Sequence, residues 1–199
     1  MFKRLFALLS PAPAPAPADN VEDDPRLVEQ ADAYEAAMAQ FMRLVSGHLG
    51  DDESARLTGH VLSQFDGSEV AGGREAVGGF FHEGVMDEEG QQRGKWLMIA
   101  VDWKASDEID WQANEILATR GIDDRWEWNA DGKTVMEGLQ VLSDWLAPHA
   151  LSLLSVDFGH DAYYMLIVDD DIAREAVELG QRAGLDVMPF PDFAATEGE

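Results

Sequence analysis

Four polar residues stand where apolar segments of the chain end. Asp102 closes the apolar run WLMIAVDW, and Asp157, His160 and Asp161 surround the turn between two further apolar runs. Ligand sites in open sheets commonly lie beyond the carboxyl ends of strands, so these side chains converge if their two strands run the same way. Carboxylate oxygens suit Mg²⁺, Mn²⁺ or Ca²⁺, and an imidazole adds a nitrogen ligand for a transition metal. Such a site would indicate a small metal-dependent hydrolase with a metal-bound water as nucleophile.

A structural explanation of the same residues carries more weight. Aspartate and glycine are ordinary turn residues, and aspartates at strand ends cap neighbouring amides. The acidic run Asp169, Asp170 and Asp171 has the character of a helix N-terminus and does not follow the spacing of an EF-hand loop. The chain also has no cysteine and no GxSxG nucleophile motif. We therefore expect no cofactor, and the metal site is the alternative prediction.

Charge and tryptophan content point instead to a protein partner. The chain carries 39 acidic and 14 basic residues, for a formal charge of -25, which disfavours direct binding to nucleic acid or anionic lipid. Exposed tryptophans anchor interfaces, and the candidates are Trp103, Trp111, Trp126 and Trp128. The leading prediction is a soluble, non-enzymatic interaction or regulatory module that presents carboxylates to a basic protein, as an inhibitor of a nuclease would. The absence of cysteine fits a reducing cytoplasm; an oligomeric state is not indicated.

These residues need a scaffold, and the segment 151–169 is its predicted centre. Two runs rich in Leu, Val, Ile and Tyr flank Gly159, which predicts a β-hairpin. Further strands are expected at 96–103, at 187–190 and, from the alternation in RWEWN, at the edge segment 125–129. Apolar residues at steps of three and four predict helices, which we place at 25–49, 51–65, 75–83, 107–120, 135–147 and 170–183. The fold class is α+β or α/β, with a mixed sheet of about four strands covered by helices and preceded by an N-terminal helical pair.

The chain length suits one domain. Residues 1–24 read as a disordered leader with a Pro-Ala linker, residues 25–192 as a single globular domain, and residues 193–199 as a flexible tail. The apolar run within the first ten residues is too short to span a membrane.

Two stretches, WLMIAVDWKASDEIDWQANEIL and LLSVDFGHDAYYMLIV, resemble an uncharacterised family of acidic bacterial domains of unknown function. The resemblance covers roughly residues 90–190. It rests on an aromatic strand ending in Asp, Trp and Lys, a helix with Trp and Gln, and a hairpin with Asp before Tyr. The matching residues are Asp102, Trp103, Lys104, Trp111, Gln112, Asp161 and Tyr163. Because the family has no established activity, the resemblance implies a domain and assigns no catalytic residue.

Overall fold

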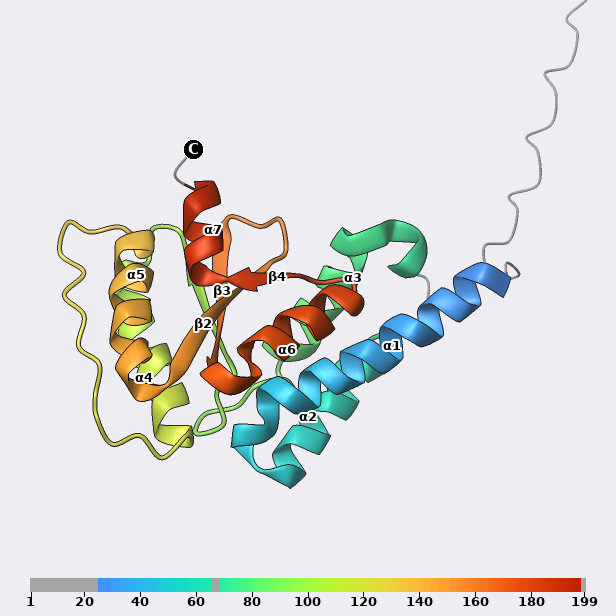
Figure 1. The fold of residues 1–199 in the computed structure, drawn as a ribbon, viewed down its shortest axis with the longest axis horizontal. Coiled ribbons are helices and arrows are strands. Elements are labelled where there is room, and N and C mark those ends of the chain that lie inside the picture. Colours follow the sequence, from blue (N-terminus) through green and yellow to red (C-terminus); the bar gives the residue numbers. More distant parts are fainter. Residues whose placement is uncertain (1–24, 66–68, 198–199) are drawn as a thin grey trace, which may run out of the picture.

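The computed structural model describes residues 25–65 and 69–197, so the predicted leader at 1–24 lies outside the described residues. Helices and strands alternate irregularly along the chain (Figure 1). The α-helices are α1 (Pro25–Ser46), α2 (Asp51–Ser63), α3 (Glu69–Met86), α4 (Ile109–Thr119), α5 (Val135–Leu146), α6 (Asp170–Arg182) and α7 (Phe190–Glu197). The strands are β1 (Met98–Asp102), β2 (Leu151–Asp157), β3 (Ala162–Asp169) and β4 (Asp186–Pro189). None of the described helices has the length and apolar character needed to cross a membrane.

The four strands form one sheet in the order β1-β3-β2-β4, and the predicted hairpin is its centre. Strands β2 and β3 pair from Leu151↔Asp169 to Ser155↔Met165, joined by a turn in which Gly159 adopts a positive φ of 71°. All neighbouring pairs are antiparallel, where the sequence predicted a mixed sheet. The four strands, the helical cover and the N-terminal helical pair are confirmed, and the antiparallel sheet makes the fold α+β.

Helices cover both faces of this sheet. Figure 1 shows α1, α2, α3 and α6 on one side and α4, α5 and α7 on the other. Successive strand residues alternate between the two cores: Met98 and Leu166 pack under the first group, whereas Ile99 and Met165 pack under the second. Because both faces are buried, the strands read in the sequence as continuous apolar runs.

Side-chain amides close the outer edge of β1. The main-chain N–H of Ala100 donates to Oε1 of Gln112 at 2.8 Å, and Nε2 of Gln112 donates back to the Ala100 carbonyl at 3.0 Å. Gln91 makes the same pair of bonds with Met98, at 2.9 and 3.2 Å. Each amide thus takes the place of a residue in a missing neighbouring strand. This closure matters because an open edge is a template for pairing with another chain.

The predicted edge strand at 125–129 is wrong, because this segment is irregular and packs on helix α4. Asn114 of α4 accepts from the N–H of Trp126 at 3.0 Å and donates to its carbonyl at 2.8 Å. The N–H of Trp128 donates to Asp110, again on α4, at 3.3 Å. The alternation of aromatic and polar residues therefore reflects docking onto a helix.

Helix α3 is longer than predicted, and helix α7 was not predicted. Helix α3 runs over 69–86 rather than 75–83, although its sequence contains many glycines. Its Gly84 lies so close to α2 that a Cβ there would be 2.8 Å from the Cα of Val61, so this glycine permits close helix packing. Residues 193–197, predicted to be a flexible tail, form the end of α7. This helix buries Phe190 and Phe193 in the core between the sheet and helices α4, α5 and α7.

Candidate functional site

A cleft of about 560 Å³ opens at the end of the sheet where the carboxyl ends of β1 and β2 lie. Both strands are antiparallel to β3, which lies between them, so they run the same way and their carboxyl ends share this edge. The structure places Asp157, His160 and Asp161, which lie at the turn between β2 and β3, in the cleft lining. Asp102 is not among the lining residues; its Oδ1 accepts from the N–H of Lys104 at 3.0 Å and caps the turn after β1.

The turn between β2 and β3 shapes one wall of the cleft. Asp157 Oδ1 accepts from the N–H of Gly159 at 2.7 Å, so this carboxylate also holds the turn. The ring of His160 lies edge-on to His82 of α3, with centroids 5.4 Å apart. Burial, and then the neighbouring His160, lower the pKa of His82 below its usual value. His160 is exposed at the cleft, and its ring contacts His82 on one side.

Helix α7 supplies the other wall, and sequence reasoning missed it because these residues were assigned to a tail. Phe193 packs edge-on against Tyr163, with ring centroids 6.0 Å apart, and both line the cleft with Glu197. The Tyr163 hydroxyl lies 3.4 Å from Glu197 Oε2. Burial, and then this carboxylate, raise the pKa of Tyr163, so the phenol keeps its proton. The spacing of Phe190 and Phe193 was the available signal for an inward helix face.

The cleft therefore combines aromatic and acidic side chains. Its lining holds the carboxylates of Asp157, Asp161 and Glu197 and no lysine or arginine. Within the described part of the chain, no three His, Asp or Glu side chains are grouped so as to hold a metal ion. The geometry gives no support to the metal-dependent hydrolase.

The four candidate tryptophans differ in accessibility. Trp103 is 51% exposed and lines the cleft, and the Lys104 ammonium lies 4.2 Å from its ring centroid. Trp111 is 39% exposed, and its indole N–H donates to Glu108, which directly precedes α4. Trp126 is 2% exposed and belongs to the core, which removes it as a surface anchor. Trp128 is partly buried and stacks on Trp126, with centroids 6.1 Å apart.

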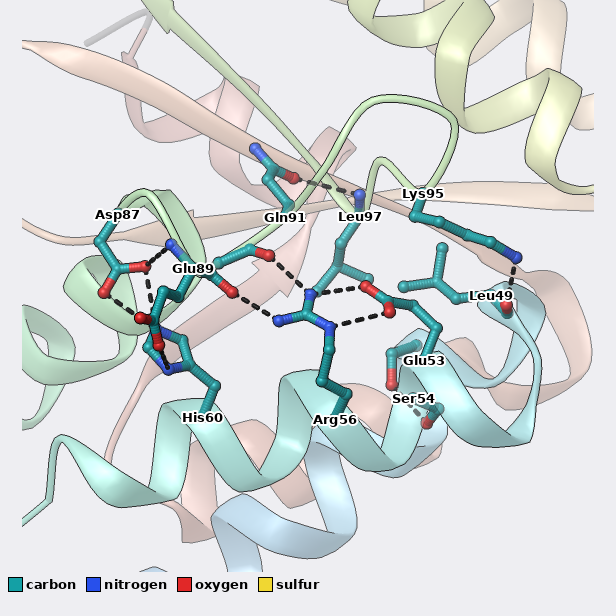
Figure 2. A network of polar contacts seen from close by, with 12 residues as sticks. Leu49, Glu53, Ser54, Arg56, His60, Asp87, Glu89, Gln91, Lys95 and Leu97 are labelled. Atoms are coloured by element: carbon teal, nitrogen blue, oxygen red, sulfur yellow. Dashed lines mark hydrogen bonds and ion pairs between the residues drawn. The ribbon is translucent and has the colours of Figure 1, made fainter.

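A separate polar network fixes the segment that leads into β1 (Figure 2). Arg56 of α2 forms a bidentate pair with Glu53 and donates to the carbonyls of Glu89 and Gly90 at 2.5 and 2.7 Å. The bond from Arg56 holds the pKa of Glu53 below its usual value. His60 contacts Asp87 at 2.9 Å. These bonds are local and structural: they hold the loop on α2, and Gln91 on that loop then binds β1.

Arg120 forms a second buried polar cluster, at the end of α4. Its side chain is 6% exposed and donates to the Ile167 carbonyl at 2.6 Å and to Asp169 at 3.0 Å. His48 lies beside it, with Nδ1 3.1 Å from the Val45 carbonyl and 3.3 Å from the guanidinium. Burial and the charge of Arg120 lower the pKa of His48 to about 4. His48 is therefore neutral in the folded protein at neutral pH.

A comparison with family models matches residues 1–190 to a domain of unknown function, DUF6630. The match extends well beyond the 90–190 span of the resemblance noted in the sequence. No curated protein and no solved structure matches the chain significantly.

Proposed function

The chain belongs to the DUF6630 family, a domain of unknown function, and we propose that it acts as an acidic module that binds a basic protein. The cleft at the ends of β1 and β2 is the proposed recognition site. The observation that carries the proposal is its lining, in which exposed Trp103 stands with three carboxylates and without a lysine or an arginine.

This lining suits a lysine or arginine side chain of the partner. A cation placed over the face of an indole ring is attracted by its quadrupole, and carboxylates supply charge-assisted hydrogen bonds to the same cation. Lys104 already occupies a position of this kind, 4.2 Å from the centroid of the Trp103 ring. This contact within the chain supports the idea that the indole ring attracts an ammonium group, and a basic side chain of the partner would have to displace Lys104 from the ring.

The charge of the whole chain supports the same class of partner. A formal charge of -25 steers a basic protein toward the acidic surface and accelerates the encounter at low salt. We place this binding in a bacterial cytoplasm, since a chain without cysteine suits a reducing compartment. Occupying the basic site of a nuclease or other phosphate-binding protein would make the module a regulator of that protein.

Calorimetric titration with a hexaarginine peptide tests the proposal at low and moderate salt. Replacing the three carboxylates together (Asp157→Asn, Asp161→Asn, Glu197→Gln) should weaken binding at least tenfold. Asparagine at 157 keeps an oxygen that can accept from Gly159, so the turn is retained. Trp103→Ala should also weaken binding, because the cation loses its aromatic surface.

A matched triple variant separates recognition in the cleft from attraction by net charge. Asp123→Asn, Asp124→Asn and Glu127→Gln lie exposed on the loop between α4 and α5 and change the charge by the same amount. We expect this variant to stay within about threefold of the wild type, since it alters only long-range attraction. Equal weakening in both triple variants, or no binding of hexaarginine to the wild type, would refute a cleft-specific site.

A further inference from the structure

Three aromatic side chains from different elements line the acidic cleft. Trp103 stands in the turn directly after β1, Tyr163 near the start of β3, and Phe193 on α7. The ring planes of Tyr163 and Phe193 are 77° apart, so these two rings form nearly perpendicular walls. Trp103 is 51% exposed and offers a third ring to a ligand. Aromatic rings that line one cleft attract a cation through their quadrupoles, most strongly where water is excluded.

The carboxylates of the cleft supply charge, but two of them already accept hydrogen bonds within the chain. Asp157 Oδ1 accepts from the N–H of Gly159 at 2.7 Å. Glu197 Oε2 accepts from the hydroxyl of Tyr163 at 3.4 Å. Part of the hydrogen-bonding capacity of these oxygens is therefore used, whereas their negative charge still acts across the cleft. Such a lining favours a cation that needs few hydrogen bonds.

A quaternary ammonium group is a cation of this kind. It carries a full positive charge and has no N–H, so it leaves no donor unpaired when it moves from water into a cleft. The three N–H groups of a plain lysine ammonium each need an acceptor there. Recognition of quaternary ammonium groups by several converging aromatic rings is the best-known use of this attraction.

We propose that the acidic cleft binds a trimethylammonium group, which contacts Trp103, Tyr163 and Phe193 and is neutralised by the surrounding carboxylates. The group would displace the ammonium of Lys104, which lies 4.2 Å from the centroid of the Trp103 ring. This inference rests on the proposed function, because it uses the same cleft and specifies the chemical form of the cation. Two carriers present the group: a trimethylated lysine of a protein, and free choline.

Calorimetric titration with two blocked pentapeptides tests the proposal at about pH 8, where histidine side chains are ordinarily neutral. Both peptides have a central lysine flanked by alanines, and in one of them this lysine is trimethylated. Their charges are equal, so long-range attraction to the chain is the same. The trimethylated peptide should bind roughly tenfold more tightly. Equal affinity, or tighter binding of the unmodified peptide, would overturn the proposal, because carboxylates alone favour a cation with N–H donors.

Two tryptophan variants locate the site. Trp103→Leu should reduce the preference for the trimethylated peptide to less than about threefold, because an aromatic wall is lost. Trp111 is 39% exposed and lies outside the cleft lining, so Trp111→Leu should keep the full preference. The readout is the ratio of the two peptide affinities, since a general loss of structure lowers both. An unchanged ratio in Trp103→Leu would overturn the assignment to this cleft.

Free choline distinguishes the two carriers. Choline should bind more tightly than its neutral analogue, in which a tert-butyl group replaces the trimethylammonium, and equal affinity would overturn the proposal. Choline that binds as tightly as the trimethylated peptide identifies a small ligand. A peptide that binds at least tenfold more tightly than choline identifies a modified protein.

The hexaarginine titration separates this inference from the proposed function. Binding of hexaarginine in the cleft, without any preference for the trimethylated lysine, would overturn only the trimethylammonium site. Binding of the trimethylammonium group without binding of hexaarginine would support the cation site and refute the module that binds basic proteins.

Discussion

His48 alone accounts for a defined part of the pH dependence of stability, because its imidazole is buried. Its pKa is about 4 in the folded protein and 6.5 in the unfolded chain. Above pH 6.5 the imidazole is neutral in both states and the stabilisation is complete. As the pH falls from 6.5 toward 4, only the unfolded state takes up the proton, so stability is lost. The gap corresponds to about 3 kcal/mol in the free energy of unfolding.

His48→Gln removes this titration, so the difference in stability between wild type and variant should shrink or reverse as the pH falls from 8 to 4.5. Urea unfolding at several pH values measures it. His149→Gln, which replaces a partly buried histidine stacked on Trp145, is the control and should follow the wild type more closely. Parallel curves for wild type and His48→Gln across the whole range would contradict a low folded-state pKa.

At the scale of elements, two glycines of helix α3 should respond in opposite directions to the same substitution. At Gly84 an added Cβ would lie 2.8 Å from the Cα of Val61, and backbone cannot move aside without separating α2 from α3. We expect Gly84→Ala to lower the free energy of unfolding by about 1–3 kcal/mol. At Gly79 nothing lies within 4 Å, so Gly79→Ala should raise it by about 0.5–1 kcal/mol through helix propensity. Urea unfolding of both variants checks the two predictions. A higher free energy of unfolding for Gly84→Ala would show that α2 and α3 are not held at this distance.

The amide of Gln112 should stabilise the sheet more than an ordinary surface glutamine. Gln112→Leu keeps the side-chain volume and leaves the N–H and C=O of Ala100 without a partner, at a cost of about 2–4 kcal/mol. Gln140 bonds only to Asp144 on the surface of α5, so Gln140→Leu should change stability by less than about 0.5 kcal/mol. Unfolding measurements test the loss of stability, and amide exchange at Ala100 should become faster in Gln112→Leu. An unchanged exchange rate would refute the edge-closing role of Gln112.

These elements also show which features a sequence can reveal. The hairpin and the helices α1, α2, α5 and α6 follow from apolar periodicity and local capping, as in the Thr134–Glu137 capping box of α5. The segment at 125–129 was assigned wrongly because its partner, Asn114, is a side chain on a helix and leaves no periodic signal. The wall of the cleft formed by α7 was missed for a different reason: the spacing of Phe190 and Phe193 was available as a signal, but residues 193–199 were assigned to a tail. Three of the four residues named for a polar site line one cleft, because they lie at the same turn between β2 and β3, whereas Asp102 at the end of β1 is a turn cap outside the lining.

At the scale of the whole molecule, the charge of -25 should have opposite effects on folding and on binding. Carboxylates that repel one another in the compact state destabilise it, and salt screens this repulsion. The urea midpoint should therefore rise when NaCl is increased from about 20 to about 300 mM, because the Debye length falls below about 10 Å within this range. Affinity for hexaarginine should fall across the same range, because the attraction is screened equally. Parallel unfolding and titration series measure both. If the affinity for hexaarginine stayed constant while the urea midpoint rose, recognition of the basic peptide would not be electrostatic. The acidic cleft would then lose its proposed role, although the charge would still destabilise the folded state.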